Sequence, residues 1–346
     1  MNLSIGILSI TMTSPLQSSV QDAMTLSDKY GAQIASKTIL VTGVSPTSIG
    51  STFVNALAAS SPSLLILAGR NPSKLSQTSA SIAEAHPTVR VRTLQVDLSS
   101  LESVRRSVEE LLSWNDVPAI DVLVNNAGVM ATGYALSQEG IESQFVANHL
   151  GHFLFTNLIM PKLLTAEAPR VVAVASDGHR LSPIRWDDLN FDGGKTYDRW
   201  RAYGQSKTAN MLFALSLSRK LAARGLQAYS VHPGVILDTG LANHLDGSSS
   251  GDFAALSSLD KAMGNAEGWK GFDAISREQA AATLLHAAFD TGLKQHNGEY
   301  LISCRVADPY RDTVRAWAVS QFEAERLWEL SEKLVGETFS YKGLRA

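Results

Sequence analysis

The stretch TILVTGVSPTSIG, residues 38–50, decides the fold of this chain. Its first five residues are apolar or β-branched and predict a strand, and a turn bounded by Gly43 and Gly50 leads into a helix. Gly43 permits the tight turn, and Gly50 lets the helix pack closely on the strand. The backbone N–H groups at the helix start would then point at an anion such as a pyrophosphate. The motif is weak alone, because many strand-to-helix turns contain two glycines.

The pattern of this first unit repeats along the chain. Helical stretches begin near Ile49, Pro72, Leu101, Glu139 and Arg201. Seven runs typical of strands lie at residues 38–42, 64–68, 89–96, 120–125, 170–175, 226–231 and 299–303. Right-handed crossovers between them predict an α/β fold with a doubly wound, seven-stranded parallel sheet of the Rossmann type. We expect residues 37–346 to form a single domain and residues 1–36 a peripheral N-terminal extension.

Composition argues against several classes of protein. The 346 residues carry a formal net charge of -3 without a run of five like charges, so we expect no nucleic-acid or anionic-membrane partner. Cys304 is the only cysteine, which excludes an intrachain disulfide and favours a reducing, cytoplasmic compartment. Apolar runs are far shorter than the ~20 residues of a membrane span, so we expect no transmembrane segment. Residues 1–12 lack Lys and Arg, which disfavours a signal peptide, and Met12 is an alternative start.

The end of the second predicted strand carries a cofactor signal. Its sequence is AGRNP, residues 68–72, at the position where NAD-binding proteins usually place an Asp or Glu for the ribose 2′-hydroxyl. Arg70 offers a planar guanidinium instead, which suits a 2′-phosphate and favours NADP(H). The alternative is a solvated arginine that opens a loop.

Two further strand ends support a nucleotide site. Asp97, followed by Leu98, comes after the third strand, and its carboxylate suits the adenine amino group. The run Asn125-Asn126-Ala127-Gly128 follows the fourth strand, and the small residues Ala127 and Gly128 would let the backbone approach a ribose. An Asn-Asn-Ala-Gly run can also be only a turn, but its place at a strand end favours function.

Tyr203 and Lys207 are the candidate catalytic pair. They are four residues apart on a predicted helix, so both side chains share one face. An ammonium there is expected to lower the tyrosine pKa from its usual ~10, so that the phenol can exchange a proton with a substrate oxygen. Ser176, at the end of the fifth strand, would share that oxygen. Asn148 lies in a largely apolar helix and would hold a water that relays protons to Lys207; the alternative is a satisfied core amide.

Other chemistries find little support. His149, His152, His179 and His232 are scattered and lack a carboxylate or cysteine partner at ligand spacing, so we interpret them as structural and expect no metal. Ser176 does not lie in a G-x-S-x-G elbow, which argues against an α/β-hydrolase.

Taken in order, these motifs resemble the short-chain dehydrogenase/reductase family over residues ~37–346. The segment between Ser176 and Tyr203, with RWRAYGQSK at 199–207, is most similar to the retinol-dehydrogenase-like branch. Many members of that branch use NADP(H) on lipophilic carbonyls or alcohols, and some fungal members tailor secondary metabolites. The resemblance implies transfer of the cofactor's pro-S hydride to or from a lipophilic ketone, aldehyde or alcohol, in a homodimer or homotetramer.

The resemblance also implies roles for individual residues. Tyr203 would exchange the proton, Ser176 orient the substrate oxygen, Lys207 also hold the nicotinamide ribose, and Asn148 complete the relay. Pro233, Gly234, Val235 and Thr239 would line the nicotinamide carboxamide. The full set expected to bind the cofactor is Gly43, Ser45, Ser48, Ile49, Gly50, Arg70, Asp97, Leu98, Asn125, Ala127, Gly128, Tyr203, Lys207, Pro233, Gly234, Val235 and Thr239.

The sequence departs from the family pattern in two places. The glycine turn is one residue longer, contains Pro46 and has Ser48 at the middle glycine, so Ser48 would either crowd a pyrophosphate or donate to it. The segment 233–239 is also one residue longer, which weakens the assignment of Val235 and Thr239.

The stretch 241–274 is the expected substrate loop, the alternative being a surface insertion. Its residues Leu241, Leu245, Phe253 and Trp269 suggest a hydrophobic lining, and the run 247–251 (GSSSG) suggests a mobile loop. Residues 327–335 are amphipathic and predict a terminal helix. The alternative to an enzyme is a non-catalytic protein that senses NADP(H) or binds a protein partner with the same fold.

Overall fold

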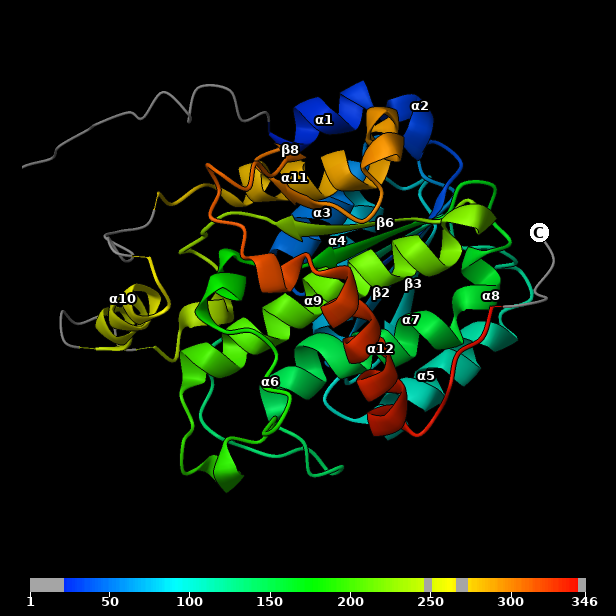
Figure 1. Ribbon diagram of the computed structural model, residues 1–346. Coiled ribbons are helices and arrows are strands. Elements are labelled where there is room, and N and C mark those ends of the chain that lie inside the picture. Colours follow the sequence, from blue (N-terminus) through cyan, green and yellow to red (C-terminus); the bar gives the residue numbers. More distant parts are fainter. Residues whose placement is uncertain (1–21, 246–250, 266–272, 342–346) are drawn as a thin grey trace, which may run out of the picture.

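The computed structural model describes residues 22–245, 251–265 and 273–341 and shows a sheet between two layers of helices (Figure 1). Within these residues the sheet has eight strands in the order β3-β2-β1-β4-β5-β6-β7-β8. Their bounds are β1 Thr38–Thr42, β2 Leu64–Gly69, β3 Val91–Gln95, β4 Val122–Asn125, β5 Arg170–Val174, β6 Gln227–His232, β7 Tyr300–Ile302 and β8 Arg305–Val306. The predicted doubly wound fold is confirmed, with the strand order reversing between β1 and β4.

The eighth strand corrects the predicted count of seven. β1 to β7 are parallel, but β8 has two residues and pairs antiparallel with β7, with Leu301 opposite Val306. The turn between β7 and β8 passes through Ser303 and Cys304, which have positive φ angles of 49° and 55°. A two-residue strand has no alternation to detect, and a turn without glycine gives no hairpin signal. The other strands begin or end within two residues of the predicted bounds.

Helices cover both faces of the sheet. One layer contains α5 (Leu101–Ser113), α7 (Gly151–Leu158), α9 (Arg199–Leu221) and α12 (Gln321–Val335), and the other contains α3 (Ile49–Ala58), α4 (Pro72–Ala85) and α11 (Arg277–Phe289). Successive residues of β1 alternate between these layers: Leu40 packs with the first, Ile39 and Val41 with the second. Both faces of the strand are buried, so it reads as a continuous apolar run. The terminal helix predicted at 327–335 is confirmed as part of α12.

Residues 22–36, from the expected peripheral extension, form two short helices, α1 (Ala23–Lys29) and α2 (Gly31–Ile34). Leu26, Tyr30 and Ile34 recur every fourth residue and are buried, and α1 contacts α3 and α11. The Tyr30 hydroxyl donates to an Asp290 carboxylate oxygen at 2.7 Å. This part of the extension therefore adds an outer layer to the core, while residues 1–21 lie outside the described residues.

The helix expected to start near Glu139 begins later. Gly140 has a positive φ of 74°, and the Glu142 carboxylate caps α6 (Ser143–Phe145). A π-helical segment, Val146–Leu150, follows and leads directly into α7. π-helical turns are often found at functional sites, and this one carries Asn148. The remaining helices are α8 (Met160–Leu163) and α10 (Asp252–Ala262), with short 3₁₀ helices at Asp177–Leu181, Asp192–Gly194, Ala222–Arg224, Gly240–Ala242, Thr291–His296 and Ala316–Ala318.

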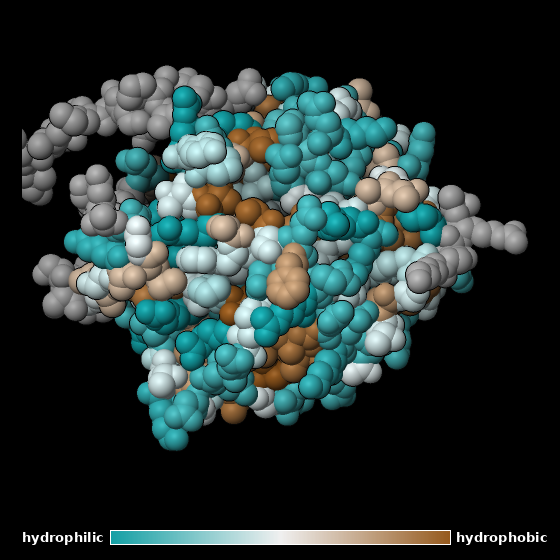
Figure 2. Space-filling view, in the orientation of Figure 1, coloured by the Kyte–Doolittle hydropathy of each residue, from teal (hydrophilic) through white to brown (hydrophobic). Residues whose placement is uncertain are grey.

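The face of the molecule seen in Figure 2 is mostly hydrophilic, with hydrophobic residues in small separate patches. Among the described residues, no helix has both the length and the apolar character that a membrane span requires.

Candidate active site

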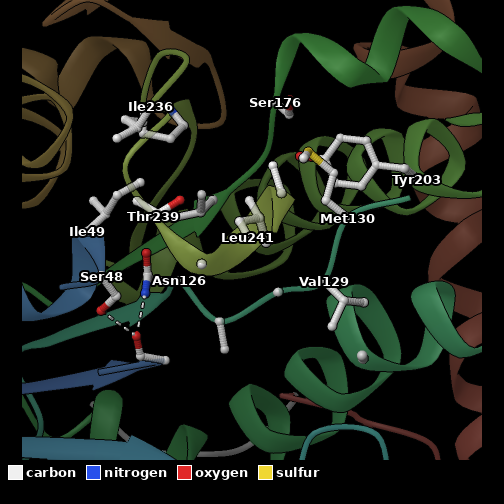
Figure 3. Close-up of a pocket in the computed structure, with 18 of the residues that line it drawn as sticks. Ser48, Ile49, Asn126, Val129, Met130, Ser176, Tyr203, Ile236, Thr239 and Leu241 are labelled. Atoms are coloured by element: carbon white, nitrogen blue, oxygen red, sulfur yellow. Dashed lines mark hydrogen bonds between the residues drawn. The ribbon is translucent and has the colours of Figure 1, made fainter. Parts of the chain in front are cut away.

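A cleft of about 1010 Å³ opens at the carboxyl ends of the parallel strands. Figure 3 shows Ser48 and Asn126 at one end of it and Ser176 and Tyr203 at the other. Most of the residues that the sequence singled out line it: Gly43, Ser45, Ser48, Ile49, Arg70, Asp97, Leu98, Ala127, Gly128, Ser176, Tyr203, Lys207, Pro233, Gly234, Val235 and Thr239. Gly50, Asn125 and Asn148 are not among the lining residues.

The glycine turn is packed so tightly that two of its positions exclude a side chain. Gly43 has a φ of +75°, and a Cβ there would lie 2.6 Å from the Ala127 Cα. A Cβ on Gly50 would lie 2.7 Å from the Gly43 carbonyl oxygen and from the Asn126 amide nitrogen. Gly50 therefore acts through packing, as its place in the turn predicts.

Ser48, at the position of the family's middle glycine, caps α3. Its hydroxyl accepts the N–H groups of Ser45 and Ser51 at 3.2 and 3.1 Å and donates to the Gly43 carbonyl at 3.3 Å. The extra residue of the turn is thus accommodated by hydrogen bonds within the turn, and the start of α3 still faces the cleft.

The two asparagines after β4 have different roles. The Asn125 side chain points away from the cleft and donates to the Thr156 hydroxyl at 2.9 Å. The next residue, Asn126, lines the cleft and donates to the carbonyl oxygens of Thr42 and Gly43 at 2.8 and 3.2 Å. Successive side chains of a strand point to opposite faces, so only one of the two can face the cleft. The structure therefore places Asn126, and not the predicted Asn125, at the cleft.

Basic groups gather where β2 ends. Arg70 lines the cleft together with Lys74 from the first turn of α4, and both are exposed. Within the described part of the chain, neither side chain makes an ion pair or hydrogen bond. Asp97 lines the same region, and one of its carboxylate oxygens accepts from the N–H and hydroxyl of Ser99. Lys74 was not predicted among the cofactor-binding residues, although it lies only four residues after Arg70.

Ser176 and Tyr203 meet where β5 faces α9. Ser176 lies two residues after the end of β5, and its hydroxyl accepts the Gly178 N–H at 3.0 Å. A Cβ on Gly178 would lie only 2.7 Å from Tyr203 Cε1, so glycine is needed for the phenol ring to approach Ser176. The Ser176 hydroxyl hydrogen-bonds the phenol and favours its ionised form.

The predicted lowering of the tyrosine pKa is wrong for this chain by itself. Burial raises the pKa of Tyr203 to about 12, an effect to which the Asp177 charge adds and which the hydrogen bond from Ser176 opposes. Lys207 Nζ lies 5.6 Å from the phenol ring centroid and donates to the Val174 carbonyl at 3.0 Å. Burial also lowers the pKa of Lys207 to about 8. Burial is therefore the largest influence on the pKa of both groups, and the helical spacing alone does not reveal how deeply they are buried.

Asn148 ties the cleft wall to α9. Its amide oxygen accepts the Val129 N–H at 2.8 Å, and its amide nitrogen donates to the Val129 carbonyl and the Ser206 hydroxyl, both at 2.9 Å. The side chain is buried and fully partnered, as a core amide would be. Its partner Ser206 lies between Tyr203 and Lys207 on α9, and the predicted relay role of Asn148 stays a proposal.

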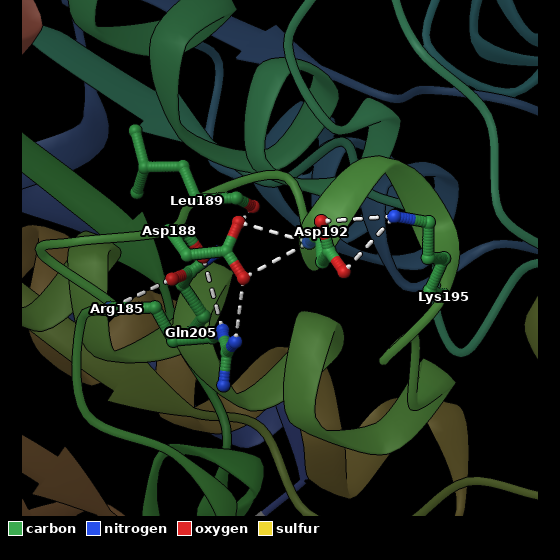
Figure 4. A network of polar contacts seen from close by, with 6 residues as sticks. All are labelled: Arg185, Asp188, Leu189, Asp192, Lys195 and Gln205. Atoms are coloured by element: carbon green, nitrogen blue, oxygen red, sulfur yellow. Dashed lines mark hydrogen bonds and ion pairs between the residues drawn. The ribbon is translucent and has the colours of Figure 1, made fainter.

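The segment between Ser176 and α9 is held by a polar network (Figure 4). The buried Gln205 accepts the Arg185 N–H at 2.8 Å and donates to the Leu189 carbonyl. Arg185 and the Asp192 N–H both bind the Asp188 carboxylate. Gln205 lies two residues after Tyr203, so this network fixes the segment against the turn of α9 that carries Tyr203.

Three of the four histidines are packed into the core. His149 bonds Ser331, His152 bonds Thr42, and His179 bonds the Ser176 carbonyl, and burial lowers the pKa of each. His232 instead lines the cleft. Among the described residues, no group of three potential metal ligands occurs.

The cleft continues beside Tyr203 as an apolar pocket, lined by Leu181, Trp200, Phe253 and Leu256. Leu181, Trp200 and Tyr203 pack with residues of the expected substrate loop, namely Leu256, Leu259 and the partly buried Leu245 and Phe253. Leu241, Phe253 and Leu256 also line the cleft. The residues 246–250, which hold most of the expected mobile loop, and Trp269 lie outside the described residues.

The buried charge of Lys207 yields a stability prediction. The pKa of Lys207 in the folded protein is about 8, below the ordinary 10.5. Below pH 8 the folded protein therefore buries a charged ammonium, which lowers the free energy of unfolding. This destabilisation disappears as the pH rises from 8 to 10.5, because the folded protein then holds a neutral amine. We expect Lys207→Met to be more stable than the wild type at pH 7, by a few kcal/mol at ~1.4 kcal/mol per pKa unit. The difference should shrink between pH 8 and 10.5.

Urea unfolding at a series of pH values measures this effect. The Val174 carbonyl keeps a second donor, the Asn210 amide at 3.0 Å, so the variant leaves no buried acceptor unpaired. Lys195→Met, at an exposed position, is the control and should leave the stability close to that of the wild type. A Lys207→Met protein that is less stable than the wild type at pH 7 would contradict the interpretation.

Known proteins resemble this chain in sequence and fold. The sequence model described as short chain dehydrogenase matches residues 37–188. Short-chain dehydrogenase TIC 32 A, chloroplastic, from Brassica napus is 36% identical over 281 residues, which are 78% of this chain and 80% of that protein. Retinol dehydrogenase 12 from Mus musculus is 34% identical over 306 residues, 88% of each chain. A solved structure of an uncharacterized protein from Mycobacterium paratuberculosis has a TM-score of 0.64 and 30% identity, and the match covers 89% of this chain and 96% of that one.

Proposed function

Since the chain belongs to the short-chain dehydrogenase/reductase family, in its retinol-dehydrogenase-like branch, we propose that it reduces a lipophilic ketone or aldehyde with NADPH. Members of this family are oxidoreductases that use nicotinamide cofactors and act on CH–OH groups or the corresponding carbonyls. The observation that carries the proposal is the position of Ser176 and Tyr203, which meet where the cofactor cleft adjoins the apolar pocket.

The chain has the parts that a dinucleotide needs. The crowded turn at Gly43 and the exposed start of α3 suit a pyrophosphate, and Asn126 and Asp97 lie where the adenosine half would follow. Lys207 would hold the nicotinamide ribose, and the segment 233–239 would line the carboxamide. A bound nicotinamide supplies the hydride, which is the chemistry that no side chain offers.

The side chains would handle the substrate oxygen and its proton. Ser176 and Tyr203 would hydrogen-bond the carbonyl oxygen, and Tyr203 would donate its proton as negative charge develops there. Burial raises the pKa of the phenol, so Tyr203 is protonated at neutral pH and can serve as the acid that carbonyl reduction needs. Asn148 and Lys207 would then return a proton to Tyr203.

Two observations support NADP(H) as the cofactor and a lipophilic carbonyl as the substrate. Arg70 and Lys74 offer two cations to a 2′-phosphate at the end of β2, and residues 69–74 contain no Asp or Glu that would accept a ribose 2′-hydroxyl instead. Leu181, Trp200 and Phe253 offer an apolar wall beside Tyr203, and retinal is a natural probe because a relative is named retinol dehydrogenase.

Consumption of NADPH in the presence of decanal, all-trans-retinal and butanal tests the proposal. We expect turnover with at least one of the two long carbonyls and none with Ser176→Ala. If NADPH binds but none of the three carbonyls is reduced, the proposal that this protein is a carbonyl reductase is wrong.

Other expectations from the sequence stay predictions. They are a cytoplasmic location, a role in secondary metabolism and a homodimeric or homotetrameric assembly. Sedimentation of the purified protein tests the last of these.

A further inference from the structure

Helix α10 forms the outer wall of the apolar pocket. It lies beyond the start of α9 at the side of the molecule (Figure 1). Leu256 and Leu259 on α10 are buried, and Phe253 packs on Trp200 with ring centroids 6.1 Å apart. Phe253 and Leu256 line the same cleft as Tyr203. The position of α10 therefore decides how much apolar surface a substrate meets beyond its carbonyl group.

One end of α10 is fixed by a buried ion pair. The Arg180 guanidinium donates from Nε to Asp260 Oδ1 at 2.7 Å and from its NH2 group to Oδ2 at 2.5 Å. The two side chains are 9% and 0% exposed. The Asn265 amide donates to the same carboxylate at 2.8 Å. A bidentate pair of this kind fixes direction as well as distance.

The other end of α10 is fixed by a second, partly exposed pair. Arg199 donates to Asp252 Oδ1 at 2.7 Å, and the Trp200 indole N–H donates to the Asp252 carbonyl oxygen at 2.8 Å. Asp252 and Asp260 are eight residues apart, so the two ion pairs hold α10 at its first and its last turn.

Both arginines come from segments that carry catalytic side chains. Arg180 lies four residues after Ser176, in the 3₁₀ helix Asp177–Leu181. Arg199 lies four residues before Tyr203, at the start of α9. A buried ion pair is often no more stabilising than an apolar pair of the same shape, so stability alone does not explain Arg180 and Asp260.

We propose that Arg180–Asp260 and Arg199–Asp252 set the position of α10 relative to Ser176 and Tyr203 and so select carbonyl substrates with a long apolar chain. The four are positioning residues, since they act through α10. The inference rests on the proposed function and adds to it which residues determine the substrate class.

Kinetics with two aldehydes of different length test the proposal. Decanal is long enough to contact Phe253 and Leu256, whereas butanal reaches little beyond Ser176 and Tyr203. For Asp260→Asn with saturating NADPH, we expect the KM for decanal to rise about tenfold, while kcat for both and the KM for butanal stay within about twofold. A rise of the KM for decanal and butanal alike, or for neither, would overturn the proposal.

Two further variants separate positioning from general damage. The exchanged pair, Arg180→Asp with Asp260→Arg, should recover part of the preference for decanal. Asp121→Asn, which breaks the 3.0 Å pair with Lys37 at the amino ends of the strands, should leave the ratio of the two KM values unchanged. If Asp260→Asn does not fold, Asp252→Asn at the more exposed pair is measured instead, with the same expectation.

Binding distinguishes failure of this inference from failure of the proposed function. If the wild type reduces none of decanal, butanal and all-trans-retinal, the proposed function fails, and calorimetric titration with 1-decanol and 1-butanol then tests the role of α10 by itself. Asp260→Asn should then weaken binding of 1-decanol alone. Equal binding of 1-decanol by variant and wild type would overturn the proposal.

Discussion

Tyr203→Phe should lower kcat by about 100- to 10,000-fold, the usual contribution of a general acid, and leave the affinity for NADPH nearly unchanged. The variant removes only the hydroxyl that would protonate the substrate oxygen. The ring itself, which packs against Gly178, Trp200 and Leu181, stays in place. Turnover of decanal or retinal and calorimetric titration with NADPH provide the two measurements.

Tyr229→Phe is a matched control for this variant. Tyr229 is also buried and burial raises its pKa to about 12, but its hydroxyl donates to the Leu293 carbonyl on the far side of the sheet from α9. We expect this control to keep wild-type kcat at the temperature of the assay. Full activity in Tyr203→Phe would show that another group donates the proton.

Arg70→Ala should remove most of the preference for NADPH. The wild type is expected to bind NADPH at least about tenfold more tightly than NADH, a difference of ~1.4 kcal/mol. Loss of the guanidinium should weaken NADPH binding by about that factor or more, because hydrogen bonds to charged groups contribute ~1.5–3 kcal/mol. Adding Lys74→Ala should abolish the preference, since both cations line the same part of the cleft. Neither change should affect NADH.

Arg90→Ala provides the control, because Arg90 is an exposed arginine that pairs with Asp116 away from the cleft. Titrations at two salt concentrations separate a specific contact from general charge, since only the latter is strongly screened. If the wild type binds NADH more tightly than NADPH, the interpretation of Arg70 is wrong.

The sequence predicts the positions of site residues that lie at the end of a strand or on one face of a helix. The apolar runs predict the seven parallel strands, and their ends bring Ser176, Arg70 and Asp97 to one cleft because parallel strands end on one side of a sheet. Tyr203 and Lys207 share one face of α9 because they are four residues apart. Gly43 and Gly50 are readable because only glycine fits the turn.

What the sequence did not reveal depends on contacts between distant segments. The choice of Asn126 over Asn125 depends on which side of β4 faces the cleft, and the high pKa of Tyr203 depends on how deeply α9 is buried. The pairing of Arg180 with Asp260 joins residues eighty positions apart, and no local pattern marks it. Strand β8 is too short to have a pattern.

The most direct test of the account is transfer of deuterium from NADPH labelled at the pro-S position of the nicotinamide ring. The protein is incubated with the labelled cofactor and with decanal or all-trans-retinal, and the alcohol product is analysed by mass spectrometry. We predict one deuterium on the carbinol carbon with the wild type, and labelled alcohol lower by about 100-fold or more in the same time with Tyr203→Phe. Alcohol formed without deuterium would contradict transfer of the pro-S hydride, and tight binding of NADPH with no alcohol formed would favour a non-catalytic NADPH-sensing protein.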